Sequence, residues 1–161
     1  MPNPLGRHMP LDGRPQKALA IAHDLGCETI QIFVSSPRTW APPATSANET
    51  EIWRAALADS GFAPIVIHAA YLINLASNSE ETRAKSRTLL RWTLHRAAEI
   101  GATEVVLHIG SHGGAGMEVG LARLAEGLAA LSAEAPATVH LLLENDVGAG
   151  NTIGSDFAAI G

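Results

Sequence analysis

Three residues of types that commonly bind metal ions stand at the ends of apolar segments. His68, His108 and Glu144 each follow a run of aliphatic residues, at intervals of 40 and 36 positions. An interval of this size accommodates one β-strand and one connecting α-helix. Because the carboxyl ends of parallel strands meet at one rim of a sheet, the two imidazoles and the carboxylate should converge there. This ligand set suits Zn²⁺, with Mn²⁺ as the second choice.

A metal ion held by these residues would suit phosphodiester hydrolysis. A carboxylate such as Glu144 can bridge two ions, and paired ions are a common device for cleaving phosphodiesters. A single strand-end histidine often only satisfies a backbone group, but three candidates on successive strands favour a site. His112, which lies in the loop after His108, is a weaker candidate.

Two loops carry large side chains where a substrate would approach such a rim. Arg38 and Trp40 follow the second predicted strand, and Tyr71, Leu72 and Asn74 follow the third. An arginine can bind phosphate through two hydrogen bonds, and an aromatic or leucine side chain can wedge between stacked bases. Trp40 could equally serve only to pack the neighbouring Ala-Pro-Pro segment.

The elements that would position these residues alternate along the chain. The patterns predict strands at 5–8, 29–34, 65–68, 104–107 and 139–143, and helices at 15–25, 46–60, 79–100, 117–133 and 155–160. This order predicts an α/β fold, a (β/α)8 TIM barrel truncated after about five β/α units. A doubly wound sheet is the alternative, but it would gather ligands at one switch point rather than from three successive strands. The aliphatic runs lack alternation, which predicts strands buried on both faces.

The overall composition is that of a globular protein with one domain, residues 1–161. Apolar residues make up 47% of the chain and charged residues 17%, and the net charge of −5 excludes a broad basic surface. Any contact with nucleic acid must therefore be local. The single cysteine, Cys27, excludes a disulfide framework. We find neither a signal peptide nor an apolar run of membrane-spanning length, which predicts a cytoplasmic protein without membrane contact.

With these motifs identified, the chain resembles the endonuclease IV family of zinc-dependent apurinic/apyrimidinic endonucleases. The resemblance implies a xylose isomerase-like TIM barrel with up to three zinc ions. It implies hydrolysis of the phosphodiester 5′ to an abasic site in double-stranded DNA, leaving a 3′-hydroxyl, by a protein that is monomeric at full length. The matching segments are Ser36–Trp40, His68–Leu75, His108–His112 and Leu143–Gly150.

The resemblance also implies roles for individual residues. His68, His108 and Glu144 would hold one zinc ion, with Glu144 as a catalytic residue that bridges to a second ion. Arg38 and Tyr71 match positions that insert into DNA at the lesion, and Leu72 and Asn74 belong to the same DNA-binding loops. These last two residues lie within the matching segment that begins at His68.

The chain departs from the family pattern in ways that bear on its activity. The family's first motif usually reads Gly-Ala-His-x-Ser, whereas here His8 is preceded by Arg7 and followed by Met9-Pro10, so His8 is only a possible pocket residue. The remaining family ligands would lie beyond Gly161. We therefore expect at most one zinc ion, poor nuclease activity, and self-association through open sheet edges.

Two other functions fit the same sequence features. A sugar isomerase or epimerase on the same barrel would use a single divalent metal ion and proton transfer. An inactive metal-binding fragment is the non-catalytic alternative. The loops that carry Arg38 and Tyr71 favour the nuclease, because a small sugar pocket does not need extended wedges.

Overall fold

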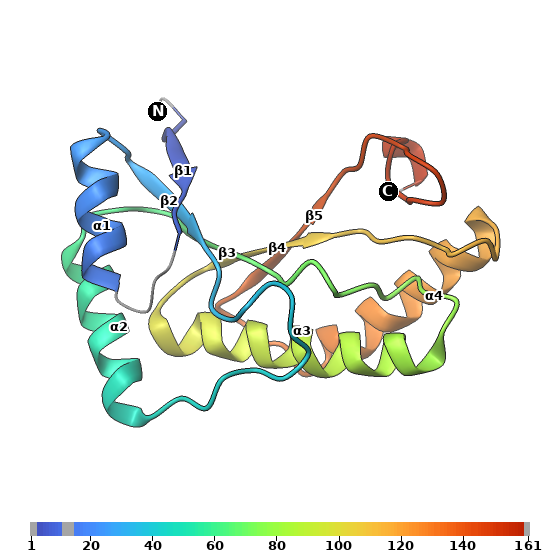
Figure 1. Cartoon of the computed structure of the whole chain (residues 1–161), viewed down its shortest axis with the longest axis horizontal. Coiled ribbons are helices and arrows are strands. Elements are labelled where there is room, and N and C mark those ends of the chain that lie inside the picture. The colour runs from blue at the N-terminus through green and yellow to red at the C-terminus, as the bar shows by residue number, and fades with distance from the viewer. Residues whose placement is uncertain (1–2, 11–14, 160–161) are drawn as a thin grey trace.

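The five strands form one all-parallel sheet in the order in which they occur along the chain (Figure 1). This computed structural model describes residues 3–10 and 15–159. The strand order is that of a (β/α) barrel wall and differs from a doubly wound sheet, whose order reverses at a switch point. The strands are β1 (Gly6–His8), β2 (Thr29–Ile32), β3 (Ile65–His68), β4 (Glu104–His108) and β5 (His140–Glu144).

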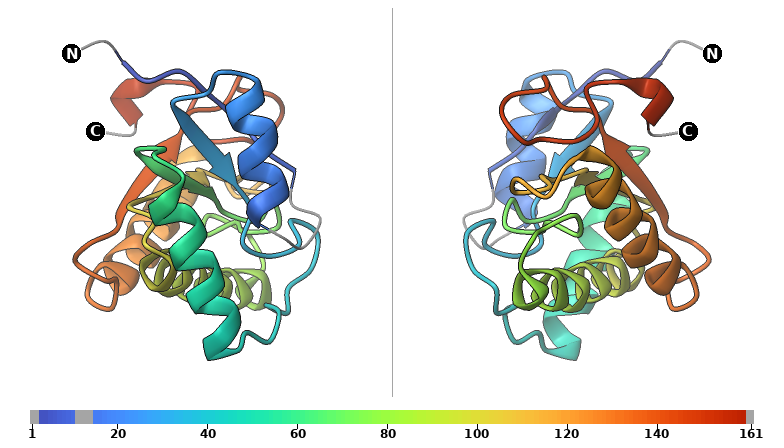
Figure 2. Two further views of the ribbon diagram at one scale, coloured as in Figure 1. Left: turned by 90° about the vertical axis from the view of Figure 1, so that its left-hand side faces the viewer. Right: turned by 90° about the vertical axis from the view of Figure 1, so that its right-hand side faces the viewer.

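Helices connect successive strands and follow one another along one side of the sheet (Figure 2). Figure 1 shows the longest of them, α3, running beneath β3 and β4. The helices are α1 (Pro15–Asp24), α2 (Ala47–Asp59), α3 (Glu80–Ile100) and α4 (Met117–Ser132), and a 3-10 turn spans Phe157–Ala159. None of the helices in the described part of the chain is both long enough and apolar enough to cross a membrane.

Capping interactions define the ends of two helices. Ser46 accepts a hydrogen bond from the Glu49 amide at the start of α2, as the spacing of these two residues indicates. Ser79 accepts one from the Thr82 amide at the start of α3. Gly101 then ends α3 with a φ of 84°, a conformation that glycine adopts without steric cost.

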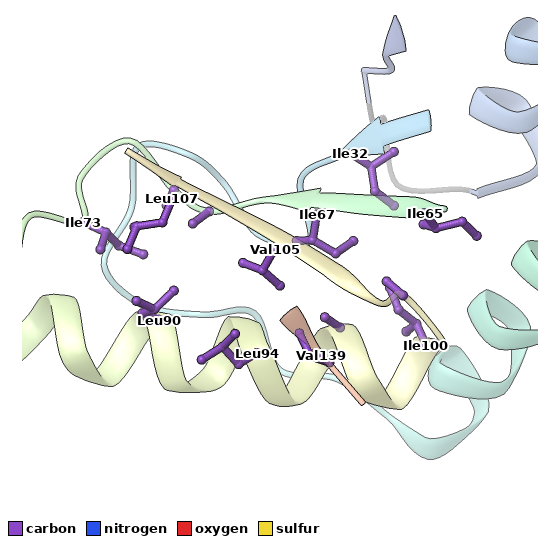
Figure 3. Packing of buried hydrophobic residues seen from close by; sticks show 14 of the residues in the cluster. Ile32, Ile65, Ile67, Ile73, Leu90, Leu94, Ile100, Val105, Leu107 and Val139 are labelled. Carbon is purple, nitrogen blue, oxygen red and sulfur yellow. The ribbon is translucent and has the colours of Figure 1, made fainter. Parts of the chain in front are cut away.

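The core lies between the sheet and α3 (Figure 3). Alternate residues of each strand point toward the helices, because side chains along a strand alternate between its two faces. Burying each such side chain stabilises the fold by about 1.5–3 kcal/mol relative to leaving it exposed. These buried residues are Ile30, Ile32, Ile65, Ile67, Val105 and Leu107 of the sheet, packed with Leu90, Leu94 and Ile100 of α3.

The opposite face of the sheet is more open, which corrects the expectation of burial on both faces. Glu104, Val106 and His108 of β4 are only partly buried on this face, although Val105 and Leu107 between them are fully buried. On β5, Leu142 is 42% exposed. The aliphatic run at β4 therefore alternates in burial although it does not alternate in polarity.

Two helix faces differ from those that apolar spacing alone would select. On α1, Leu19 is buried whereas Ile21 is 38% exposed, and Leu25, just beyond the end of the helix, is 54% exposed, although both share an apolar spacing with Ala18. On α4, the buried positions include Gly120 and Gly127, where the absence of a side chain allows close packing. Periodicity therefore locates the helices but selects their buried faces only approximately.

Candidate metal centre

The register of three neighbouring strands places His68, His108 and Glu144 on one face of the sheet. His108 and Glu144 are direct partners across β4 and β5, and His68 is the partner of Val106 across β3 and β4. Partner residues in neighbouring strands point to the same face, and so do residues two apart in one strand. The three side chains therefore share the open face, at the carboxyl ends of their strands.

The polar atoms of these side chains converge around one carboxylate oxygen. Glu144 Oε2 lies 3.2 Å from His68 Nε2 and 3.5 Å from His108 Nε2. One potential ligand atom from each residue lies within 4.8 Å of the other two. Tetrahedral bonds of 2.0–2.1 Å to zinc imply ligand separations of about 3.3 Å. The two measured separations to Glu144 match this spacing closely.

The main-chain contact of His68 selects the tautomer of its neutral imidazole. Its Nδ1 lies 2.7 Å from the Ala69 carbonyl oxygen, which can only accept, so Nδ1–H donates a hydrogen bond to it. In the neutral imidazole, Nε2 then has a lone pair that faces the Glu144 carboxylate. Two acceptors at 3.2 Å repel each other unless a proton or a cation lies between them. This arrangement fits a metal ligand, because such histidines usually donate their second nitrogen to a carbonyl or carboxylate.

The three ligand candidates differ in their access to solvent. His68 is 6% exposed, whereas the side chains of His108 and Glu144 are 41% and 45% exposed. The centre is thus anchored on a buried imidazole and open on one side. A catalytic metal site needs this kind of opening, because substrate or water must reach the ion.

Two aromatic rings, those of Tyr71 and Phe33, pack near the imidazoles on one side of the cluster. The Tyr71 ring meets the rings of His68 and His108 edge-on, with centroids 5.4 and 5.6 Å away. Phe33, which directly follows β2, lies 5.2 Å from His68 and 5.3 Å from Tyr71. These rings restrict water on one side of the ligand cluster. Tyr71 itself is 55% exposed and so remains available to a substrate.

His8 lies beside the cluster but outside it. Its ring centroid is 5.9 Å from that of His68, and its Nδ1 lies 2.9 Å from Gln31 Nε2 on the adjacent strand. Burial, followed by repulsion from His68, lowers the pKa of His8 below its ordinary value. His8 therefore contributes a neutral imidazole near the site at physiological pH.

His112 has a local role in its loop. Its Nδ1 accepts hydrogen bonds from the amides of Gly114 and Gly116, at 3.2 and 3.1 Å, just before α4 begins at Met117. Among residues 3–10 and 15–159, the group whose atoms could share one ion consists of His68, His108 and Glu144, so His112 is not part of it.

The residues expected to contact DNA occupy different environments. Arg38 is exposed on the loop after β2, and Trp40 packs partly buried against the core. Leu72 is half-buried beside the exposed Tyr71. Asn74 is also half-buried, and its side-chain amide is bonded to the loop that follows β4. Arg38 and Tyr71 are therefore the most accessible of this set.

Two residues of the site were not singled out from the sequence. Phe33 lies within the predicted apolar strand 29–34 and is easily taken for another core residue. Gln31 faces His8 because β1 and β2 pair in that register, with His8 and Gln31 as direct partners. Gln31 is a polar residue between two isoleucines, Ile30 and Ile32. This alternation in the sequence could have placed Gln31 on the face of the sheet opposite to theirs.

The match to known sequences and the geometry agree on the family. A sequence profile described as the xylose isomerase-like TIM barrel matches residues 19–160. The chain belongs to this family. The five-stranded parallel sheet with its helices on one side is the corresponding part of such a barrel.

Within the xylose isomerase-like TIM barrel family, the chain is similar to proteins named probable endonuclease 4. It is 36% identical over 158 residues to that of Halorhodospira halophila, covering 97% of this chain and 53% of the relative. It is 43% identical over 155 residues to that of Streptomyces avermitilis, covering 94% and 50%. The chain thus spans about half the length of the curated relatives that it matches.

Solved structures give the same similarity in three dimensions. The crystal structure of endonuclease IV from Thermus thermophilus superposes with a TM-score of 0.79 and 34% identity, covering 98% of this chain and 57% of that one. A structure of L-ribulose 3-epimerase superposes with a TM-score of 0.70 at 18% identity, covering 89% and 50%. This second likeness is one of fold alone.

Proposed function

We propose that this chain contributes the metal-binding rim of an endonuclease that hydrolyses the phosphodiester 5′ to an abasic site in double-stranded DNA. The observation that carries the proposal is the placement of Glu144 Oε2 3.2 and 3.5 Å from two imidazole nitrogens. The similarity to proteins named probable endonuclease 4 supports the reaction class.

Zinc is the ion that we assign to this centre. His68 Nε2, His108 Nε2 and one oxygen of Glu144 would hold it, which is the nitrogen and oxygen ligand set typical of catalytic zinc. When bound, zinc supplies Lewis acidity, which stabilises negative charge on phosphate oxygens and promotes the ionisation of water at neutral pH. The buried His68 anchors the ion, and the open face admits a phosphodiester.

The protein groups around the centre have separate tasks in this proposal. The contacts of Glu144 with both imidazoles go through Oε2, so Oε1 is left to accept a proton or to bind a second cation. The hydrogen bond from His68 to the Ala69 carbonyl fixes the imidazole orientation and keeps Nε2 directed at Glu144. Tyr71 shields the imidazoles from bulk water on one side.

DNA would approach the open face through the loops after β2 and β3. Arg38 is an exposed cation on the first loop, and Tyr71 presents a half-exposed ring on the second. A guanidinium binds phosphate, and an aromatic ring fills the space left by a missing base. Because the net charge is −5, such local contacts must provide the attraction to DNA.

The test is incision of a duplex that carries one abasic site, compared with an undamaged duplex of the same sequence. We expect slow, zinc-dependent cleavage 5′ to the lesion by this chain, lost on chelation and in Glu144→Gln. A matched control is His140→Gln, because His140 shares the open face but pairs with Glu104 at the far end of β4. Epimerisation of a ketose without discrimination of abasic DNA would instead identify a sugar-converting enzyme and overturn the proposal.

A further inference from the structure

The side chain of Asn74 joins two loops that begin at different metal-ligand candidates. Its Nδ2 donates to the Ser111 carbonyl at 2.9 Å, and its Oδ1 accepts from the Ser111 amide at 3.1 Å. The same Oδ1 accepts from the Ala76 amide at 3.1 Å. Three of the four hydrogen bonds that an asparagine side chain can make are therefore committed to main-chain groups.

These contacts lie close to the candidate metal ligands in the chain. Ser111 is three residues beyond His108, and Asn74 is six residues beyond His68. The paired bonds between Asn74 and Ser111 span 37 positions of sequence. They therefore fix the loop that leaves His108 against the loop that leaves His68.

Asn74 is itself held in place from the helix layer. Its main-chain amide donates to Ser86 Oγ at 2.9 Å, and Ser86 is a fully buried residue of α3. A buried polar group with a hydrogen-bond partner is costly to displace, because the partner would be left unsatisfied. The link between the two loops is thus anchored to α3, which packs against the sheet in the core.

Gly110 shows how closely the two loops fit. It has a φ of 99°, and a Cβ at this position would collide with Asn74 Oδ1. Any side chain here would both strain the backbone and displace the asparagine amide. The strand end that carries His108 is therefore shaped to receive Asn74.

We infer that Asn74 is a positioning residue for the metal centre: it holds the His108 loop against the His68 loop so that both imidazoles stay directed at Glu144. This inference rests on the proposed metal-binding function. It assigns Asn74 a role different from the DNA contact expected from the sequence, because its amide is committed to Ser111 and Ala76.

The expected effect is a weaker centre with an intact fold. Residues that orient metal ligands without touching the ion typically change metal affinity by about 10- to 100-fold when replaced. Asn74→Ala removes all three side-chain bonds. Asn74→Asp keeps the Oδ1 acceptor but sets a carboxylate oxygen against the Ser111 carbonyl, so it should weaken zinc binding without removing side-chain volume.

The experiment measures zinc affinity of the purified chain by competition with a chromophoric chelator. It is paired with visible spectra of the Co²⁺-substituted protein, whose bands depend on ligand geometry, and with hydrogen exchange of the Ser111 amide. The matched control is Asn78→Asp, the same chemical change at a position further along the same loop. Melting temperatures are measured for each variant, and Asn74→Asp carries the comparison if Asn74→Ala is destabilised.

We expect both Asn74 variants to bind zinc about 10-fold or more weakly and to show altered Co²⁺ spectra, with Asn78→Asp unchanged. Exchange of the Ser111 amide should accelerate in Asn74→Ala. Unchanged zinc affinity and unchanged Co²⁺ spectra in both variants would overturn the inference about Asn74 but not the proposed metal centre. Variants that lost only DNA binding would have the same consequence. Absence of zinc binding by the unsubstituted chain would overturn the proposed metal centre and the inference with it.

Discussion

Glu144 Oε2 lies 3.2 Å from His68 Nε2, although 76 positions separate the two residues in sequence. Their strands are not adjacent, since β4 lies between them. On β4, the partner of His68 is Val106 and the partner of Glu144 is His108. The two side chains are therefore offset by two residues along β4 and point to the same face of the sheet. Strand register, more than any local motif, therefore determines whether these groups can share an ion.

Glu144→Gln should lower zinc affinity by at least about 10-fold, because an amide oxygen carries no charge to offset the cation. Competition with a chelator measures this loss directly. Glu104→Gln is the matched control: it removes a carboxylate from the same face of the sheet, at the other end of β4 beside His140. Equal affinity in both variants would count against Glu144 as a ligand.

Arg38→Ala should weaken binding to abasic duplex while leaving zinc content unchanged, because Arg38 is exposed and is not among the clustered ligands. Loss of one phosphate contact should also reduce the slope of log affinity against log salt by about 1. Fluorescence anisotropy over a salt series measures both effects. Lys85→Ala, on the exposed face of α3, removes one cation away from the loops and serves as control. A similar change in the two variants would indicate nonspecific attraction.

His8 should make the metal-free fold less stable in mild acid. Its pKa is lowered in the folded chain from the ordinary value of 6.5 by burial and by His68, so the unfolded chain takes up this proton first. The contribution to the free energy of unfolding is complete above pH 6.5 and declines as the pH falls toward the folded-state pKa. Urea denaturation across this range should show a shallower decline in His8→Gln than in the unsubstituted chain.

Gly120→Ala should destabilise the protein although alanine favours helices over glycine by about 1 kcal/mol. A Cβ at Gly120 would lie 2.6 Å from His112 Cβ and 2.7 Å from Ile153 Cδ1. Overpacking of this kind costs about 1–3 kcal/mol, measurable by urea denaturation. Gly127→Ala in the same helix should cost less, because its nearest neighbour is the Leu75 side chain at 3.3 Å. Stabilisation by Gly120→Ala would show that the α4 packing has room for a methyl group.

The chain should associate as its concentration rises. Among the described strands, β1 and β5 form the two edges of the sheet, and Leu142 of β5 is 42% exposed. An open edge offers unpaired amides and carbonyls to another chain. Sedimentation velocity should show less association in Leu142→Lys, because a charged residue near an edge opposes pairing. Val147→Lys, at a loop position that is 94% exposed, tests whether added charge alone has the same effect.

The convergence of the three ligand candidates was predictable because strand ends are local features. Each of His68, His108 and Glu144 follows an aliphatic run, and parallel strands must bring their carboxyl ends to one rim. The structure extends β4 to include His108 and ends β2 at Ile32, two residues before the predicted limit. The strand order also agrees with the predicted barrel topology, since each βα unit adds one neighbouring strand.

The interactions between loops were not predictable from the sequence. Asn74 has the same polar character whether it faces DNA or a main-chain group 37 positions away, and only the fold decides between them. The partial exposure of one face of β4 could not be predicted either, because Val106 on that face is as aliphatic as its buried neighbours. An apolar side chain can be buried at low cost, but whether it is buried depends on which other elements of the fold cover that face of the sheet.

The strand order β1-β2-β3-β4-β5 has a consequence for how the sheet assembles. Every strand pairs with the one that precedes it in the chain, so each new pairing closes a loop of only one helix and its turns. Each of these loops is shorter than one that would join strands at opposite edges of the sheet, so closing it costs less conformational entropy. The sheet can therefore grow at one edge in the order of the chain, and no new strand has to insert between two strands that are already paired.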